Sequence, residues 1–188
     1  MSPNDKIKLF KEATIKFNNK HNLISKKNTD KIIEEAIEEA IALTEHLKQN
    51  KNILDIGTGS GLPGIPHAIF NEDKNIYLSE KNNKKNYHLK KTVRELGIKN
   101  ATTIGPSNKK TKINKKIDCV VSKAFASTKK TIEITNSFLE KPFTLMLLKG
   151  KLETINEEIT EANITKENYE IIKIENKKEK HILKIRNE

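Results

Sequence analysis

The chain has 188 residues, which is the size of a single domain and is long enough to bury a core without disulfides or metals. Its 36 basic and 25 acidic residues give a net charge of +11 at pH 7, which favours an anionic partner, most simply nucleic acid. Arg94 and Arg186 are the two arginines and all other basic residues are lysines. An A/T-rich genome, which favours Lys, Asn and Ile codons, is therefore a second explanation of the composition.

The composition also excludes several classes of protein. Cys119 is the single cysteine, so the chain has neither a disulfide framework nor a cysteine-based metal site. No apolar run approaches the roughly 20 residues of a membrane span, and residues 1–10 lack the apolar segment of a signal peptide. We therefore expect a soluble, cytoplasmic protein without membrane contact or metal. The histidines lack metal-ligand spacing and are interpreted as solvated or locally packed: His21, His46, His67, His88 and His181.

Two amphipathic helices are predicted before the first glycine-rich stretch. Apolar residues at helical spacing indicate one helix over residues 3–20 and a second over about 30–48. In the second helix the isoleucines and alanines form one face, and Glu34, Glu35, Glu38 and Glu39 are expected on the opposite face. Residues 1–50 are accordingly predicted to be a helical extension packed on one compact domain formed by residues 51–188.

From residue 52 the pattern changes to alternating strands and helices, which predicts a mostly parallel α/β sheet with helices on both faces. A basic loop is expected over 106–116, and the helix over 82–97 is expected to turn Tyr87, Leu89, Val93 and Leu96 inward. The last two strands have almost no chain for a helix between them and are predicted to be antiparallel. The predicted strands are 52–57, 76–80, 101–105, 117–122, 143–150, 170–175 and 181–185, and the predicted helices are 62–70, 82–97 and 127–140.

The stretch "NILDIGTGSGLPGIP" (52–66) is the best candidate for a ligand site. It contains G-x-G-x-x-G from Gly59, a weak dinucleotide pattern, and an overlapping G-x-G-x-G from Gly57. In both patterns glycines let the backbone approach a ligand, and an acid after the second strand binds ribose hydroxyls. Glu80 stands at that position. A tight turn without a ligand is the alternative.

Two features favour S-adenosylmethionine (SAM) over a dinucleotide in this loop. Asp55 is an acid inside a strand, where it loses hydration unless loop amides or a cationic ligand compensate it, and SAM carries an ammonium and a sulfonium. Pro63 and Pro66 follow the turn and remove N–H donors on which a pyrophosphate would depend.

Several stretches together resemble the RsmG (GidB) family of 16S rRNA guanine-N7 methyltransferases. "LDIGTGSGLPGIP" is similar to the family's glycine signature, and "VVSKAFAS" (120–127) is similar to its S-R-A-F-A motif. Further similarities are "FNNKHNL" (17–23), "VRELGIKN" (93–100) and "LLKG" (147–150). The resemblance implies a class I SAM-dependent methyltransferase fold: a Rossmann-like, mostly parallel seven-stranded sheet with an antiparallel final strand, preceded by an N-terminal helical extension.

The resemblance also implies a set of site residues. Gly57 and Leu62 would line the SAM pocket, with Asp55, Gly59 and Gly61 shaping it and Glu80 binding the ribose. Lys123 stands where the family has the Arg of S-R-A-F-A, which contacts cofactor and RNA. Counting from Asn100 to Ser122 places the adenine contacts at Asn108 and Lys109. The implied target is guanine 527 in the 530 loop of 16S rRNA, presented as RNA or as the small ribosomal subunit to a monomeric enzyme.

This chain departs from the family pattern at three places. The adenine loop normally carries an Arg and a Glu but here reads "SNKK" (107–110), and Lys123 lacks the planar fork of an arginine. The helix before the first strand has an Arg-His pair in the family, whereas here it reads "IIEEAIEEAI" (32–41). Lysine-favouring drift in an A/T-rich genome and decayed activity are both open explanations.

The motifs that are missing are consistent with methylation of a ring nitrogen. Guanine N7 has a lone pair and no proton, so its methylation requires positioning and no general base. The chain lacks the Asn/Asp-Pro-Pro-aromatic motif of amine methylation, and Cys119 lies mid-strand, where it is interpreted as a packed residue rather than a nucleophile. A non-catalytic rRNA-binding relative and a small-molecule or protein methyltransferase are the competing hypotheses. The candidate RNA contacts are Lys84, Lys85, Lys123, Phe125 and Lys149, with Phe125 expected either to stack on a base or to lie in the core.

Overall fold

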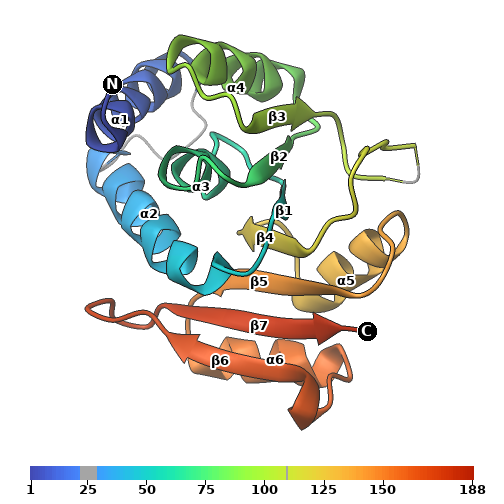
Figure 1. Ribbon diagram of the computed structural model, residues 1–188. Helices are drawn as coiled ribbons and strands as arrows, with labels where there is room; N and C mark the ends of the chain where they lie inside the picture. Colours follow the sequence, from blue (N-terminus) through green and yellow to red (C-terminus); the bar gives the residue numbers. More distant parts are fainter. Residues whose placement is uncertain (22–28, 109) are drawn as a thin grey trace.

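The computed structural model describes residues 1–21, 29–108 and 110–188. Two helices precede an alternating series of strands and helices, and the chain ends in two strands (Figure 1). The helices are α1 (Pro3–His21), α2 (Thr29–Thr44), α3 (Gly64–Phe70), α4 (Asn83–Glu95), α5 (Thr128–Asn136) and α6 (Leu152–Glu161). The strands are β1 (Asn52–Ile56), β2 (Asn75–Ser79), β3 (Ala101–Ile104), β4 (Cys119–Lys123), β5 (Phe143–Lys149), β6 (Tyr169–Lys173) and β7 (His181–Asn187).

The strands form one seven-stranded sheet in the order β3-β2-β1-β4-β5-β7-β6. Neighbours from β3 to β5 pair in parallel, and β7 pairs antiparallel with both β5 and β6. The predicted sheet and its antiparallel final strand are thus confirmed. Because β1, β2, β4 and β5 are parallel, the residues that follow their carboxyl ends meet at one edge of the sheet, where open α/β folds bind ligands.

Two hydrophobic clusters fill the two sides of the sheet. One contains Phe10 of α1 and Ile33 of α2 together with residues of α3 and α4, so the N-terminal helices share a core with the sheet. The other contains Ile155 and Ile159 of α6, with Ile132 of α5 packed against it. Helix α6 was not among the sequence expectations, although Leu152, Ile155 and Ile159 recur in it at helical spacing.

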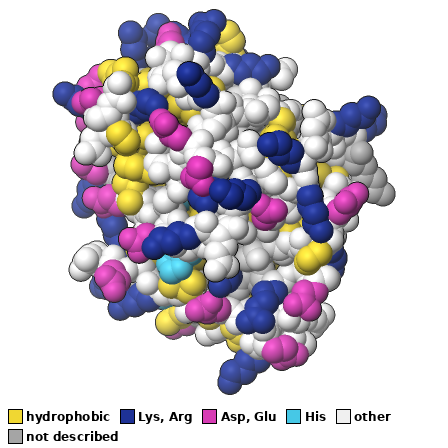
Figure 2. Space-filling view, viewed as in Figure 1, with side chains coloured by type: hydrophobic (Ala, Val, Ile, Leu, Met, Phe, Trp, Pro, Cys, Tyr) yellow, Lys and Arg dark blue, Asp and Glu magenta, His cyan; other side chains and the backbone are white. Residues whose placement is uncertain are grey.

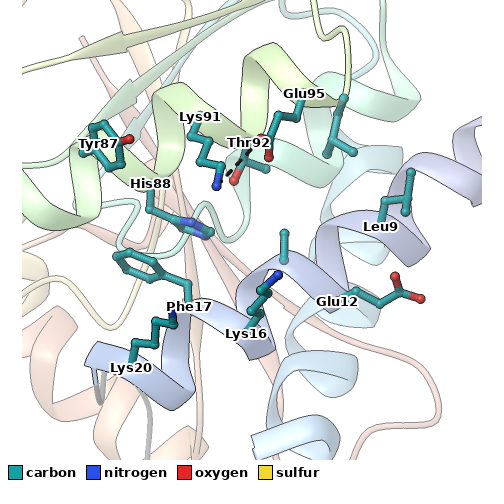
Figure 3. A pocket seen from close by; sticks show the side chains of 12 residues that line it. Leu9, Glu12, Lys16, Phe17, Lys20, Tyr87, His88, Lys91, Thr92 and Glu95 are labelled. Carbon is teal, nitrogen blue, oxygen red and sulfur yellow. Dashed lines mark ion pairs between the residues drawn. The ribbon is translucent and has the colours of Figure 1, made fainter.

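Two expectations about helix faces are wrong. Glu39 does not lie on a solvated face of α2, since it is 2% exposed and surrounded by the end of β4 and the β6–β7 turn. Tyr87 of α4 was expected inward but is 68% exposed, and the neighbouring His88 is buried instead. The His88 ring stacks on Phe17 of α1, with 4.1 Å between ring centroids (Figure 3). The stacking on α1 buries His88, whereas Leu89 and Leu96 are buried as expected.

The remaining sequence expectations have mixed outcomes. No helix is found among the described residues between β3 and β4, as the basic stretch 106–116 predicts. Part of the "FNNKHNL" similarity, Lys109 and the side chain of His21 lie outside the described residues. None of the described helices is both long enough and apolar enough to cross a membrane. Lysines and acids are interspersed over the face seen in Figure 2, so the surplus of lysine does not form a continuous basic surface there.

Candidate active site

The glycine loop between β1 and α3 is held in a conformation that favours glycine. Gly57, Gly59 and Gly61 have φ values of +69°, +61° and +101°. Gly57 has a second constraint besides its positive φ, because an added Cβ would lie 2.3 Å from Cδ2 of Phe125. The β4–α5 segment that carries Phe125 therefore closes directly over the loop after β1.

Asp55 organises this loop from beneath. Its carboxylate is fully buried, and Oδ2 accepts hydrogen bonds from the Thr58 hydroxyl at 2.5 Å and from the Gly64 amide at 2.7 Å. Burial outweighs these bonds and raises the pKa of Asp55 to about 7. Loop donors, which were one of the two compensations expected for this acid, are found at Oδ2. The Gly64 amide is the first of α3, so the position where a pyrophosphate would bind is already taken by a carboxylate.

Glu80 follows β2 and faces the same loop. Its Oε2 accepts from the Gly59 amide at 3.1 Å and its Oε1 accepts from the Asn82 amide at 2.7 Å. The side chain is 8% exposed, and each carboxylate oxygen has a further lone pair. A carboxylate fixed in this way can accept from the two hydroxyls of a ribose. The glycine loop and Glu80 therefore fit the nucleoside portion of SAM.

The remaining predicted cofactor contacts are less directly presented. Leu62 is buried in the cluster shared with α3 and α4. Asn108 is exposed, and its amide and side chain bond within its own loop, to Thr111 and Lys110. Ser107 links this loop to the end of β2 through a 2.6 Å hydrogen bond between its hydroxyl and that of Ser79. The loop is therefore anchored beside the cofactor region through Ser107, and Lys109 lies outside the described residues.

Lys123, at the carboxyl end of β4, is held by an acid from the N-terminal extension. Its Nζ lies 2.7 Å from Oε2 of Glu39, and Nζ of Lys180 lies 2.8 Å from Oε1 of the same carboxylate. Burial alone would raise the pKa of Glu39, but the two ammonium groups lower it below its usual value. The acidic α2 thus supplies the counter-charge for the lysine of S-K-A-F-A.

A second ion pair lies at the carboxyl end of β5. Nζ of Lys149 is 2.5 Å from Oε2 of Glu158 on α6, and the same oxygen accepts from the amide and hydroxyl of Thr128. The two ion pairs face a cavity of about 320 Å³. Phe125 is half-buried and lies between this cavity and the glycine loop. It packs against the core cluster, as one of its two expected roles requires, and it also lines the cavity.

Sequence reasoning placed Lys123, Lys149 and Phe125 at this edge but missed Glu39, Glu158 and Lys180. A usable signal existed for the two acids, because a half-buried lysine at a strand end needs a carboxylate partner. Lys84 and Lys85 are not part of the cavity. They lie in the first turn of α4, where the Asn82 side chain accepts from both of their amides.

Comparisons with known proteins agree with this geometry. Residues 3–184 match the model of the GidB family, described as rRNA small subunit methyltransferase G. The ribosomal RNA small subunit methyltransferase G of Brachyspira hyodysenteriae is 37% identical over 185 residues, covering 96% of this chain and 90% of that protein. The protein of the same name from Actinobacillus pleuropneumoniae is 41% identical over 112 residues, covering 60% of this chain and 54% of that protein.

Solved structures share the fold at low identity. A SAM-dependent methyltransferase from Aquifex aeolicus has a TM-score of 0.58 at 16% identity, covering 81% of this chain and 89% of that chain. M. jannaschii TYW2 in complex with AdoMet has a TM-score of 0.56 at 20% identity, covering 80% and 74%.

The sheet order and the glycine loop define the fold as that of a class I SAM-dependent methyltransferase. Within that class, the chain belongs to the rRNA small subunit methyltransferase G family, whose model spans nearly all of it. It is accordingly a SAM-dependent rRNA methyltransferase.

Proposed function

We propose that the enzyme methylates N7 of a guanine in 16S rRNA, at the position numbered 527, and that its substrate is 16S rRNA or the small ribosomal subunit. The observation that carries this proposal is the polar cavity beside the glycine loop, lined by Lys123 and Lys149 and separated from the loop by Phe125. A cavity of about 320 Å³ at this edge can admit one nucleobase. The proposal extends to a monomeric, cytoplasmic enzyme that needs no metal.

The chemistry asks little of the protein beyond placement. When bound, SAM supplies an electrophilic methyl group, and guanine N7 offers a lone pair without a proton. Glu80 and the loop from Gly57 to Leu62 would hold the cofactor, while Lys123 would position the base. No general base is required, which suits a cavity whose two carboxylates are both held in ion pairs.

Cys119 supports a ring-nitrogen target by its environment. Methylation at pyrimidine C5 requires an accessible thiolate. The Cys119 side chain is fully buried in β4, and burial raises the pKa of its thiol strongly. This cysteine is a core residue and does not serve covalent catalysis.

Mass mapping of 16S rRNA tests the proposal. RNA from cells with the gene is expected to carry 7-methylguanosine at the target position, and RNA from cells without it is expected to lack the modification. Complementation with the wild-type gene should restore the methyl group, and a Glu80→Ala gene should restore less. Persistence of the modification in the deletion strain, with no second enzyme present, would contradict the proposal.

The competing hypothesis drawn from the sequence departures at 107–110 and Lys123, a relative that binds rRNA without catalysing methyl transfer, runs against the family membership of the chain. Calorimetry with SAM separates it from the proposed function. A catalytic enzyme should bind SAM, and Glu80→Ala should weaken that binding at least about tenfold, because two charge-assisted hydrogen bonds are lost. An enzyme that binds RNA but gives no heat with SAM would favour the competing hypothesis.

A further inference from the structure

Glu158 presents a fixed acceptor to the cavity. All of its side-chain hydrogen bonds run to Oε2, from Lys149 Nζ, from the Thr128 amide and from the Thr128 hydroxyl. Within the part of the chain that the structure describes, Oε1 has no hydrogen-bond partner. Oε1 is solvent-accessible, and the Glu158 residue lines the cavity.

The carboxylate is ionised at neutral pH. Burial alone would raise the pKa of Glu158, but the hydrogen bonds from Lys149 and Thr128 outweigh burial and lower it. The three donors on Oε2 also fix the orientation of the group. A second polar group therefore meets a defined, negatively charged acceptor at Oε1.

Lys123 offers the complementary donor. Its ammonium has three N–H groups, of which the ion pair with Glu39 engages one side. Because β1, β4 and β5 are adjacent in the sheet, three features follow one another along its carboxyl edge. These are the glycine loop after β1, the Lys123 ammonium at the end of β4, and the Glu158 carboxylate bonded to the end of β5.

The edge of a guanine has the same order of groups. N7 is a lone-pair acceptor, O6 beside it is a second acceptor, and N1–H beside O6 is a donor. We propose that Glu158 is the specificity-determining residue of the cavity, its Oε1 accepting from N1–H of the target guanine while Lys123 donates to O6. N7 is then left facing the glycine loop. This assignment rests on the proposed function and adds the means by which the base is chosen.

The arrangement rejects adenine by charge and hydrogen-bond pattern. An adenine in the same orientation would place its N6 amino group against the Lys123 ammonium, and its N1 lone pair against the Glu158 carboxylate. Donor would then face donor at N6, and acceptor would face acceptor at N1. Sites that leave buried polar groups unpaired in this way discriminate strongly between substrates.

The test compares two bases in two variants. The substrate is 16S rRNA, assembled into small subunits, with guanine or adenine at the target position, and the readout is the ratio of kcat/KM for the two. Glu158→Gln replaces the acceptor charge with an amide that can also donate to adenine N1, so we expect the guanine-to-adenine ratio to fall by about 10- to 100-fold. Glu157→Gln, an exposed neighbour on α6, is the matched control and should leave the ratio unchanged.

If the Glu158→Gln enzyme folds but is inactive, base preference is measured by binding instead of by kcat/KM. Affinities are measured, with S-adenosylhomocysteine present, for the same RNA carrying guanine, inosine or adenine at the target. The wild type should bind inosine, which keeps N1–H and O6, within a fewfold of guanine, and adenine much more weakly. In Glu158→Gln the preference for guanine over adenine should shrink while SAM binding stays near wild type.

The outcomes separate this inference from the proposed function. A wild-type enzyme that methylates no guanine in 16S rRNA contradicts the proposed function. A wild-type enzyme that does so, with a Glu158→Gln variant that keeps the full preference for guanine in binding, overturns only the role of Glu158. Loss of activity with an unchanged base preference would make Glu158 a structural partner of Lys149 and would equally overturn the inference.

Discussion

The cofactor half of the active edge, after β1 and β2, differs in construction from the cavity half, after β4 and β5. In the cofactor half the acids Asp55 and Glu80 are held mainly by backbone amides, those of Gly64, Gly59 and Asn82. In the cavity half, side chains hold side chains, and the partners of Lys123 and Lys149 come from α2 and α6. Backbone amides are present whatever the side chains are, so the first half depends on conformation and the second on a few matched charges.

The largest effect on stability is expected at Gly64, where the neighbouring side chains leave no room for a Cβ. An added Cβ would lie 2.3 Å from Leu78 Cδ2 and 2.6 Å from Asp55 Oδ2, and Asp55 is itself fixed by the loop. Gly64→Ala should therefore lower the free energy of unfolding by about 3 kcal/mol and weaken SAM binding in calorimetry. Gly105→Ala, where an added Cβ meets nothing within 4 Å, should be neutral. Equal stability of the two variants would show that the loop after β1 can accommodate a side chain at position 64.

The next effect concerns Glu39 and tests whether the two halves are separable. Glu39→Ala leaves Lys123 and Lys180 close together without their shared counter-charge and should cost about 2 kcal/mol of stability. Methyl transfer to rRNA should fall while the dissociation constant for SAM stays within about twofold, because Glu39 bonds to nothing in the cofactor half among the described residues. Glu38→Ala, which removes a more exposed ion pair, to Lys177 of the β6–β7 turn, is the control. A large loss of SAM affinity would mean that the halves are coupled.

The same contrast explains what the sequence alone could predict. The cofactor half is encoded by residues close together in the chain: glycines, an acid three residues before its hydroxyl donor Thr58, and Glu80 after the next strand. The glycines, Asp55 and Glu80 predicted the SAM loop, and the alternation of strands and helices predicted the parallel sheet. Local pattern is enough there, because the contacts are made within one strand–turn–helix unit and its neighbour.

The cavity half could not be predicted in the same way. Glu39 was assigned to an exposed face because α2 alternates pairs of acids with apolar residues, and periodicity cannot tell which acid meets a lysine from β4. Helix α6, which carries Glu158, was not predicted from the sequence, although Leu152, Ile155 and Ile159 recur there at helical spacing. Likewise, only the packing of α1 on α4 decided that His88 rather than Tyr87 is buried.

The free energy of unfolding should depend on pH with opposite sign for the acids of the two halves, and the change due to Asp55 should be about 1 to 2 kcal/mol. The pKa of Asp55 is about 7 in the folded protein and near 3.8 when unfolded, so the folded state retains a proton that the unfolded state has lost. Stability from this group therefore falls as pH rises from about 4 to 7. Glu39 and Glu158, whose pKa values are lowered, have the opposite sign, and their contribution is lost only in acid.

Asp55→Asn isolates this effect. The wild-type free energy of unfolding, minus that of the variant, should decrease between pH 5 and pH 8 in denaturant titrations. His67 is buried with its pKa lowered to about 3, and it raises stability with pH below 6.5, but its contribution cancels in this difference. A difference that is flat across the window would mean that Asp55 is ionised at pH 5 and better compensated than its two donors to Oδ2 suggest.

The smallest effect is expected at the lysines of α4, which lie beside the cofactor half but outside the cavity. If Lys84 and Lys85 contact rRNA phosphates, replacing either with Ala should reduce the slope of log affinity against log salt by about 1, with SAM binding unchanged. Lys166 is the matched control. Because β6 runs parallel to β5, this exposed lysine just before β6 lies at the opposite edge of the sheet. An equal change of slope for Lys166→Ala would mean that the charge of +11 acts diffusely and that RNA docks on no single edge. A change confined to α4 would instead extend the RNA surface from the cavity across the cofactor half. The rRNA would then contact both halves of the active edge.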